Sequence, residues 1–141
     1  MNLCLKKFIE EKFKKQGKAL DLGAGNFSDV NYLKQLGWKC EGVDKNVGVD
    51  LVYSNYVFHK LVDREQFVKT AYDNLKVGGW FFLHTFDKSD SNSNSDITSN
   101  SLKEMLKRQG FRNIRIRAFD YYDKEKGHNH WHKILEATSQ K

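Results

Sequence analysis

The chain has 141 residues, and its 24 Lys and Arg against 18 Asp and Glu give a net charge of +6. Hydrophobic residues make up 39% of the sequence and charged residues 30%, which excludes a disordered chain and is typical of one globular domain over residues 1–141. The apolar runs are too short to span a membrane and no secretory signal is present, so we expect a cytoplasmic protein in which Cys4 and Cys40 are reduced.

The first 17 residues predict an amphipathic helix surrounded by lysines. Its apolar positions recur at helical spacing, at Leu3, Leu5, Phe8, Ile9 and Phe13. A basic helix of this kind is able to contact a membrane or RNA. The better explanation is that its apolar face covers a sheet.

Strands and helices then alternate along the chain. Short apolar runs predict strands over residues 18–22, 38–43, 50–58 and 80–86. Between them, amphipathic patterns predict a helix over residues 28–36 and another helix that Asp63 caps. The unbroken apolar residues 80–83 are typical of a strand buried on both faces. This alternation predicts an α/β fold with a doubly wound, mostly parallel sheet.

The last third of the chain begins with a polar segment of low complexity. Residues 87–101 predict a mobile loop inside the single domain, because helical signals resume directly after it. Ser101 and Glu104 predict a capping box at the start of that helix. Alternating residues over 111–117 and the apolar segment 131–138 predict the two final strands.

The end of the first predicted strand carries the most informative motif. Asp21 is followed by Gly23 and Gly25, and glycines allow a sharp turn and a close approach of ligand to the backbone amides. Asp44 ends the second predicted strand, where an acid accepts hydrogen bonds from ribose hydroxyls. Ser28 stands where a nicotinamide fingerprint needs its third glycine, and Asp21 suits a cationic amino group. The pattern predicts a nucleotide-like cofactor that carries such a group.

With these residues in place, the chain resembles the class I S-adenosylmethionine-dependent methyltransferases. The matching segments are residues 20–25, 42–44, 50–61, 74–80 and 102–111, followed by the two closing strands. The resemblance implies a Rossmann-like fold with a C-terminal antiparallel hairpin over 111–138. Only the short link 45–49 stands where the family has a helix and a third strand, so we expect six strands, without that third-strand region.

The resemblance also implies S-adenosylmethionine as cofactor and a set of residues that bind it. Asp21 and the glycine turn would hold the methionine end, Asp44 the ribose, and Asn55 the mouth where the methyl group is transferred. Asp50 either replaces the missing acid that contacts adenine or only opens the next strand. Candidate cofactor-binding residues are Asp21, Gly23, Ala24, Gly25, Asn26, Phe27, Asp44, Lys45, Asp50 and Asn55. Phe27 occupies the position of the family's third glycine.

The expected reaction is methyl transfer to a small-molecule acceptor by direct in-line displacement. This chemistry depends mainly on alignment of the reactants, so no dedicated catalytic residue is assigned. Tyr56, His59 and His84 are candidates for the substrate pocket, because they follow or end predicted strands. The acceptor is expected to be small because the chain has no added domain to bind a polymer. The N-terminal helix and the 87–101 loop would form a lid.

Three histidines near the C-terminus raise the question of a metal. His128, His130 and His132 alternate along the sequence, so their side chains point the same way on a strand. No cysteine or acid lies beside them in the sequence to complete a site, and we therefore expect no metal.

Two other functions compete with small-molecule methylation. With its third-strand region missing, the chain is also compatible with a non-catalytic interaction protein that binds the cofactor weakly or not at all. The positive charge alone favours an RNA methyltransferase, and nucleic acid stays a less favoured partner.

Overall fold

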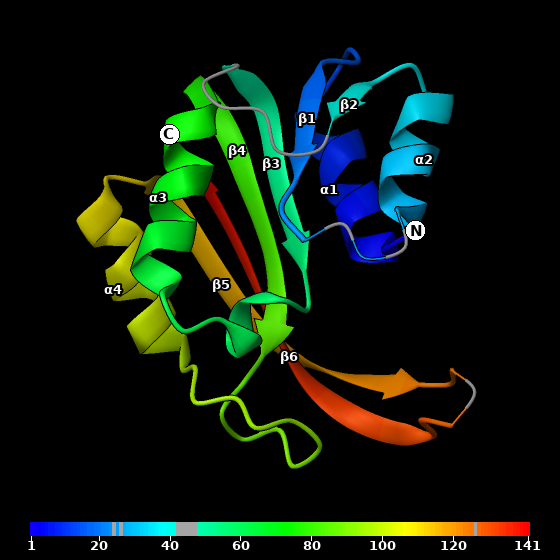
Figure 1. Ribbon diagram of the computed structural model, residues 1–141, viewed down its shortest axis with the longest axis vertical. Helices are drawn as coiled ribbons and strands as arrows, with labels where there is room; N and C mark the ends of the chain where they lie inside the picture. Colours follow the sequence, from blue (N-terminus) through cyan, green and yellow to red (C-terminus); the bar gives the residue numbers. More distant parts are fainter. Residues whose placement is uncertain (24, 26, 42–47, 126) are drawn as a thin grey trace.

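The computed structural model describes residues 1–23, 25, 27–41, 48–125 and 127–141. Its six-stranded sheet has the order β2-β1-β3-β4-β6-β5 (Figure 1). The strands are β1 (Lys18–Asp21), β2 (Lys39–Glu41), β3 (Val49–Asn55), β4 (Leu75–Phe86), β5 (Arg112–Asp123) and β6 (His130–Gln140). The first four strands are parallel, whereas β6 is antiparallel to both β4 and β5. The predicted Rossmann-like sheet of six strands with a C-terminal antiparallel hairpin is confirmed.

Helices cover both faces of the sheet. They are α1 (Leu3–Lys12), α2 (Ser28–Gln35), the short 3-10 helix η1 (Phe58–Lys60), α3 (Arg64–Asn74) and α4 (Ser99–Gln109). Figure 1 shows α1 and α2 together on one side, and α3 and α4 together on the other. No helix among the described residues has the length and the apolar composition that crossing a membrane requires.

Two apolar cores follow from the alternation of side chains along the central strands. Leu51 of β3 and Phe82 of β4 belong to the cluster under α1 and α2, whereas Val52 and Phe81 belong to the cluster under α3 and α4. Successive residues of a strand point to opposite faces, so a strand between two helical layers is apolar at every position. Phe81, Phe82 and Leu83 are at most 1% exposed, which confirms the expectation of a strand buried on both faces.

The N-terminal helix lies on the sheet as its pattern indicates. Leu5, Phe8 and Ile9 are buried in the core that includes Leu51 and Phe82. The Asn2 side chain caps the helix by accepting hydrogen bonds from the backbone N–H groups of Cys4 and Leu5, the second and third residues of α1. The expectation that the apolar face covers a sheet is confirmed, and the start of α1 lies at one end of that sheet (Figure 1).

The start of α4 differs from its prediction. The helix begins at Ser99, and the capping box joins Thr98 and Ser101, so the prediction that Ser101 pairs with Glu104 is wrong. The reason is that Thr98 adopts the extended conformation of a capping residue and its hydroxyl accepts the Ser101 N–H. Four residues of the predicted 87–101 loop, 98–101, therefore belong to the boundary or first turn of α4.

The remainder of that loop contacts the rest of the fold at several points. Asp90 and Ile97 are 5% and 3% exposed, and the Lys88 N–H donates to the Ile97 carbonyl at 2.7 Å. The Asn92 amide donates to the Trp131 carbonyl of β6 at 2.8 Å. These contacts place the loop beside β6, and its mobility stays a prediction.

Phe27 allows a test of the turn that leads into α2. The residue has a φ of 61°, and its side chain is 53% exposed. A left-handed backbone costs an L-residue about 1–2 kcal/mol, so Phe27→Gly should raise the free energy of unfolding by about 1 kcal/mol over Phe27→Ala, which keeps the Cβ atom. Urea unfolding of the two variants measures this difference. Equal stability of both would show that the backbone at this position carries no strain.

Candidate functional site

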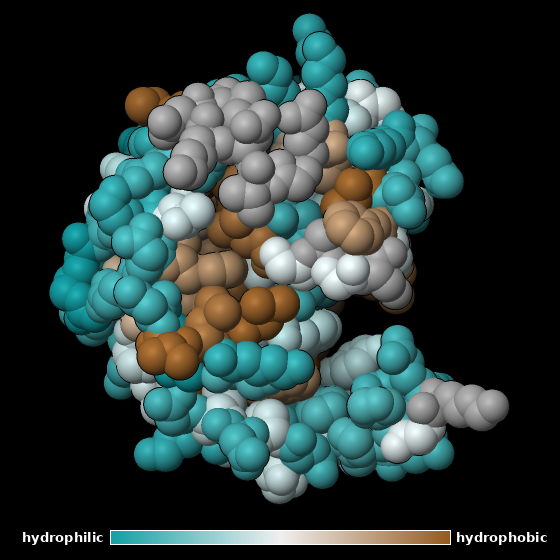
Figure 2. Space-filling model, viewed as in Figure 1, coloured by the Kyte–Doolittle hydropathy of each residue, from teal (hydrophilic) through white to brown (hydrophobic). Residues whose placement is uncertain are grey.

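A pocket of about 1050 Å³ lies at the carboxyl ends of the parallel strands. Residues at the ends of β1, β3 and β4 line it, together with the start of α1 and the tip of the β5–β6 hairpin. Figure 2 shows this face deeply hollowed between the hairpin, which projects at the lower right of Figure 1, and the rest of the molecule. Ligands of open α/β sheets bind at this edge, so the pocket is the candidate functional site.

The glycine turn after β1 forms part of the pocket wall. Gly23 and Gly25 both have positive φ angles, 92° and 53°, and both line the pocket. A Cβ atom on Gly23 would lie 2.6 Å from Cγ2 of Val57, whereas one on Gly25 would meet no atom of the described residues within 4 Å. Gly23 therefore permits close packing, and Gly25 leaves its backbone open toward a ligand.

Asp21 places a buried carboxyl group beside this turn. The residue is 5% exposed, and its burial raises the pKa to about 6, opposed by a hydrogen bond with Tyr53 and assisted by the nearby charge of Asp29. A carboxylate that is costly to bury gains most from a cationic ligand. The site thus suits an ammonium group.

Other predicted cofactor residues fall in different places. Asp50 begins β3 at the edge opposite the pocket, where its carboxylate accepts the Lys18 N–H at 2.8 Å and pairs with Lys76. Because the strand runs away from this carboxylate toward the pocket, Asp50 is removed from the candidate site. Phe27 precedes α2 and is not part of the pocket lining. Ala24, Asn26, Asp44 and Lys45 lie outside the described residues.

Asn55 ends β3 inside the pocket and joins a polar network. Its side-chain amide donates to Oδ2 of Asp29 at 2.8 Å, and its Oδ1 accepts from Nδ2 of Asn2 at 2.9 Å. The Asn2 N–H in turn donates to Oδ1 of Asp29 at 2.9 Å. Asn2 and Asp29, which sequence reasoning missed, hold the starts of α1 and α2 at the pocket rim.

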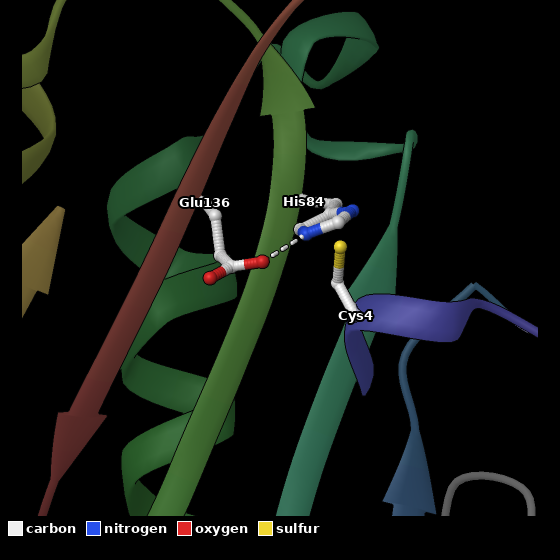
Figure 3. Close-up of side chains that lie close together, drawn as sticks. All are labelled: Cys4, His84 and Glu136. Atoms are coloured by element: carbon white, nitrogen blue, oxygen red, sulfur yellow. Dashed lines mark hydrogen bonds and ion pairs between the residues drawn. The ribbon is translucent and has the colours of Figure 1, made fainter. Parts of the chain in front are cut away.

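A row of charged and ionisable side chains crosses the three C-terminal strands at the pocket. His84 of β4 lies opposite Glu136 of β6, which lies opposite Arg117 of β5. Glu136 accepts from Nε2 of His84 at 2.7 Å and from Nε of Arg117 at 2.7 Å, the first of which Figure 3 shows. Burial by itself would raise the pKa of Glu136, but the hydrogen bonds from His84 and Arg117 lower it to about 2. Glu136 is therefore ionised at neutral pH, and its two partners hold it in one position.

This carboxylate orients the imidazole of His84. Nδ2 of Asn2 lies 3.0 Å from Nδ1 of His84, and an amide nitrogen only donates, so Nδ1 carries the lone pair and Nε2 carries the proton that faces Glu136. The Tyr56 hydroxyl lies 3.4 Å from the same Nδ1, and burial raises the pKa of that phenol. His84 thus presents a basic nitrogen on the pocket side of a histidine–carboxylate pair.

Cys4 lies close to this pair, and its sulfur points toward His84 (Figure 3). The potential ligand atoms of Cys4, His84 and Glu136 lie within 4.8 Å of one another. However, the Arg117 guanidinium lies 3.7 Å from the Cys4 sulfur and also bonds both oxygens of Glu136. Burial and the charge of Glu136 raise the pKa of the Cys4 thiol. A fixed cation and a protonated thiol disfavour metal binding at this cluster.

His59 and Tyr56 line the pocket on either side of Phe86. The Tyr56 ring stacks on Phe86 at 5.2 Å, and the His59 ring meets it edge-on at 4.8 Å. Burial, with the charges of Lys60 and Arg64, lowers the pKa of His59. Its Nδ1 is buried, and none of the described residues hydrogen-bonds to it. A ligand in the pocket is able to satisfy this nitrogen.

Comparisons with known proteins identify the family and the fold. A family model described as a methyltransferase domain matches residues 4–132. No curated protein matches the chain. Among solved structures, a SAM-dependent methyltransferase from Archaeoglobus fulgidus has a TM-score of 0.74 at 15% identity, covering 99% of this chain and 92% of that one.

Two structures with bound ligands share the fold. The 1,6-didemethyltoxoflavin-N1-methyltransferase of Burkholderia thailandensis, with 1,6-didemethyltoxoflavin and S-adenosylhomocysteine bound, has a TM-score of 0.71 at 15% identity, covering 95% of this chain and 75% of that one. A phosphoethanolamine N-methyltransferase of Haemonchus contortus, with phosphomonomethylethanolamine and S-adenosylhomocysteine bound, has a TM-score of 0.73 at 12% identity. The match covers 99% of this chain and 53% of that one. The family match over most of the chain shows that it belongs to the class I S-adenosylmethionine-dependent methyltransferases.

Proposed function

We propose that this chain transfers the methyl group of S-adenosylmethionine to a small-molecule acceptor bound in the pocket. The observation that carries the proposal is that Asp21 and the glycine turn line the same cavity as His84, Tyr56 and His59. The volume of about 1050 Å³ is at the upper end for ligand pockets, which suits a cofactor together with a small acceptor. The toxoflavin methyltransferase, which shares the fold, has a small molecule and S-adenosylhomocysteine bound at once.

The cofactor's methionine end fits the region around β1. Asp21 would bind the ammonium group, and backbone N–H groups of the glycine turn before α2 would bind the carboxylate. Asp44 stays the predicted ligand of the ribose hydroxyls, from the sequence alone. When bound, the cofactor supplies the methyl group on its sulfonium.

His84 is the proposed proton acceptor on the other side of the cavity. Its Nδ1 would take the proton of an acceptor hydroxyl or amine, and the carboxylate of Glu136 would stabilise the imidazolium that forms. An acceptor that reaches Nδ1 would replace the hydrogen bond from Asn2. The arrangement favours acceptors that lose a proton on methylation. Alignment of the acceptor and the methyl group for in-line displacement would provide the rest of the rate acceleration.

Calorimetric titration with S-adenosylmethionine and S-adenosylhomocysteine tests the proposal first. Micromolar binding of both is expected, followed by transfer of labelled methyl groups to members of a small-molecule library. Absence of binding by either ligand would contradict the proposal and favour the non-catalytic interaction protein. Transfer to RNA in place of small molecules would favour the RNA methyltransferase.

Gly25→Ala tests whether the glycine turn binds the cofactor. The added Cβ atom meets no described atom within 4 Å, so it should narrow the ligand space and weaken cofactor binding by about tenfold. Gly78→Ala is the matched control, because Gly78 also has a positive φ and open surroundings but does not line the pocket. Both variants should lose about 1 kcal/mol of stability from left-handed strain. Equal cofactor affinity in the two variants, measured by calorimetry, would remove Gly25 from the site.

A further inference from the structure

The three C-terminal strands line the acceptor side of the pocket with successive rows of facing side chains. Phe86 of β4 lies opposite Ile134 of β6, which lies opposite Phe119 of β5, and all three line the pocket. This apolar row follows the row that contains His84, because alternate residues of a strand share one face. The two rows are about 7 Å apart, which is the length of a benzene ring with one substituent. An acceptor whose reactive atom lies at Nδ1 of His84 therefore has its body over apolar side chains.

The next row adds a tyrosine to this side of the pocket. Tyr121 of β5 lies opposite His132 of β6, whose Nδ1 lies 3.0 Å from Oδ2 of Asp90. The Tyr121 ring lines the pocket and is 47% exposed. Burial first, and then Tyr121, raise the pKa of Tyr56, so the two phenol groups lie near each other on the lining. Aromatic rings from the end of β3 and from β5 thus meet at the acceptor side.

Positive side chains are scarce on this lining. Among the described residues of the pocket wall, Lys60 is the one lysine or arginine, whereas the acids are Asp21, Asp29, Asp123 and Glu125. A phosphate or carboxylate group on the acceptor would face more acidic than basic side chains. The lining therefore disfavours an anionic acceptor.

The use of a histidine as proton acceptor sets a further limit on the acceptor. The ordinary pKa of a histidine side chain is about 6.5, that of a phenol is about 10, and that of water is about 15.7. Transfer of a proton to an imidazole is thus far less costly from a hydroxyl on an aromatic ring than from an aliphatic hydroxyl, which resembles water.

We propose, as an extension that rests on the proposed methyl transfer, that the acceptor is a neutral phenol. Its ring would lie over Phe86 and Phe119 beside Tyr121, and its hydroxyl would donate to Nδ1 of His84. The phenol oxygen forms a bond to the methyl carbon, and the carbon–sulfur bond breaks with its electron pair left on sulfur. The phenol proton passes to Nδ1 of His84 and then to water. The products are an aryl methyl ether and S-adenosylhomocysteine.

A ligand-observed NMR titration of the whole protein, with and without S-adenosylhomocysteine, tests the acceptor class by binding alone. The probes are phenol and cyclohexanol, which have the same number of heavy atoms and differ in the aromatic ring and the acidity of the hydroxyl. Phenol should bind about tenfold more tightly than cyclohexanol.

Two variants of neighbouring tyrosines locate this binding on the pocket side of β5. Tyr121→Ala should weaken phenol binding about three- to tenfold, because it removes an aromatic contact. Tyr122→Ala is the matched control, since Tyr122 lies on the opposite face of β5 against Trp131 and is not part of the described lining. It should bind phenol as tightly as the parent protein, and circular dichroism checks that both variants fold.

Transfer of a labelled methyl group then compares phenol, cyclohexanol and cyclohexylamine as acceptors, with the label expected on the phenol oxygen. Three results would overturn the inference: equal affinity for phenol and cyclohexanol, unchanged phenol affinity in Tyr121→Ala, or label on the alcohol or amine in place of phenol. Selective phenol binding in a protein that binds neither S-adenosylmethionine nor S-adenosylhomocysteine would contradict the methyl-transfer proposal alone, because the binding preference does not require the cofactor.

Discussion

Asp21→Asn should weaken S-adenosylmethionine binding by about 100-fold, because it removes the buried charge that pairs with the cofactor's ammonium group. The same change should stabilise the cofactor-free protein. Calorimetry measures the affinity, and urea unfolding measures the stability. A binding residue whose ionised form opposes folding is expected to show this opposite pair of effects, whereas a purely structural residue would not.

The pH dependence of this variant follows from the raised pKa of Asp21. The folded-state pKa is about 6 and the ordinary value is 3.8, so between these values the folded protein binds more protons than the unfolded chain. The ionised carboxyl therefore lowers stability as pH rises through that window. Asp21→Asn should gain about 1–3 kcal/mol above pH 6 and little below pH 4.

Cofactor affinity gives the second readout of Asp21. In the parent protein it should increase as pH rises through about 6, because the carboxylate is the form that binds an ammonium, and it should be flat in Asp21→Asn. Asp50→Asn is the control, since Asp50 lies at the opposite edge of the sheet. Parent-like affinity in Asp21→Asn would refute the assigned role.

Glu136→Gln should lower the free energy of unfolding by about 2 kcal/mol at pH 7, because it removes the partly buried charge that pairs with His84 and Arg117. The folded-state pKa of Glu136 is about 2 against an ordinary value of 4.5. A lowered pKa contributes stability that is present above the ordinary value and is lost as pH falls toward the folded one. The difference in the free energy of unfolding between the parent protein and Glu136→Gln should thus vanish near pH 2.

Urea unfolding across this pH range measures the effect of Glu136→Gln. Glu104→Gln serves as the control, because Glu104 is exposed on α4 and its contact with Lys107 spans 3.9 Å, so a change below about 0.5 kcal/mol is expected. If the loss of unfolding free energy in Glu136→Gln did not change with pH, the contribution of Glu136 would come from packing rather than from its charge.

Local patterns determined the parts of this protein that depend on neighbours in the chain. Short apolar runs and the helical spacing of apolar residues between them predicted an alternating α/β fold, which the six-stranded sheet confirms. The glycine turn after Asp21 was readable because positive φ angles, as at Gly23 and Gly25, favour a residue without a Cβ atom. The family resemblance over these segments is confirmed by the match over residues 4–132.

Contacts across strands required the tertiary structure. Glu136 interrupts an apolar run, which is a signal of a buried polar role, but only the β4–β6–β5 register shows that its partners are His84 and Arg117. The structure also places Asp50 at the edge of the sheet opposite the pocket, where it contacts Lys18. Strand register and loop placement depend on the summed packing of the whole core.

The chain order and periodicity of the sequence by themselves determined the layers of this fold and the position of its glycine turn, because both depend on local backbone geometry. The tertiary structure alone decided that Asn2 meets His84 and that Asp90 meets His132, pairs separated by 82 and 42 residues in the chain. Such pairs form because packing of the helices and strands brings distant segments together, and no local pattern encodes that distance.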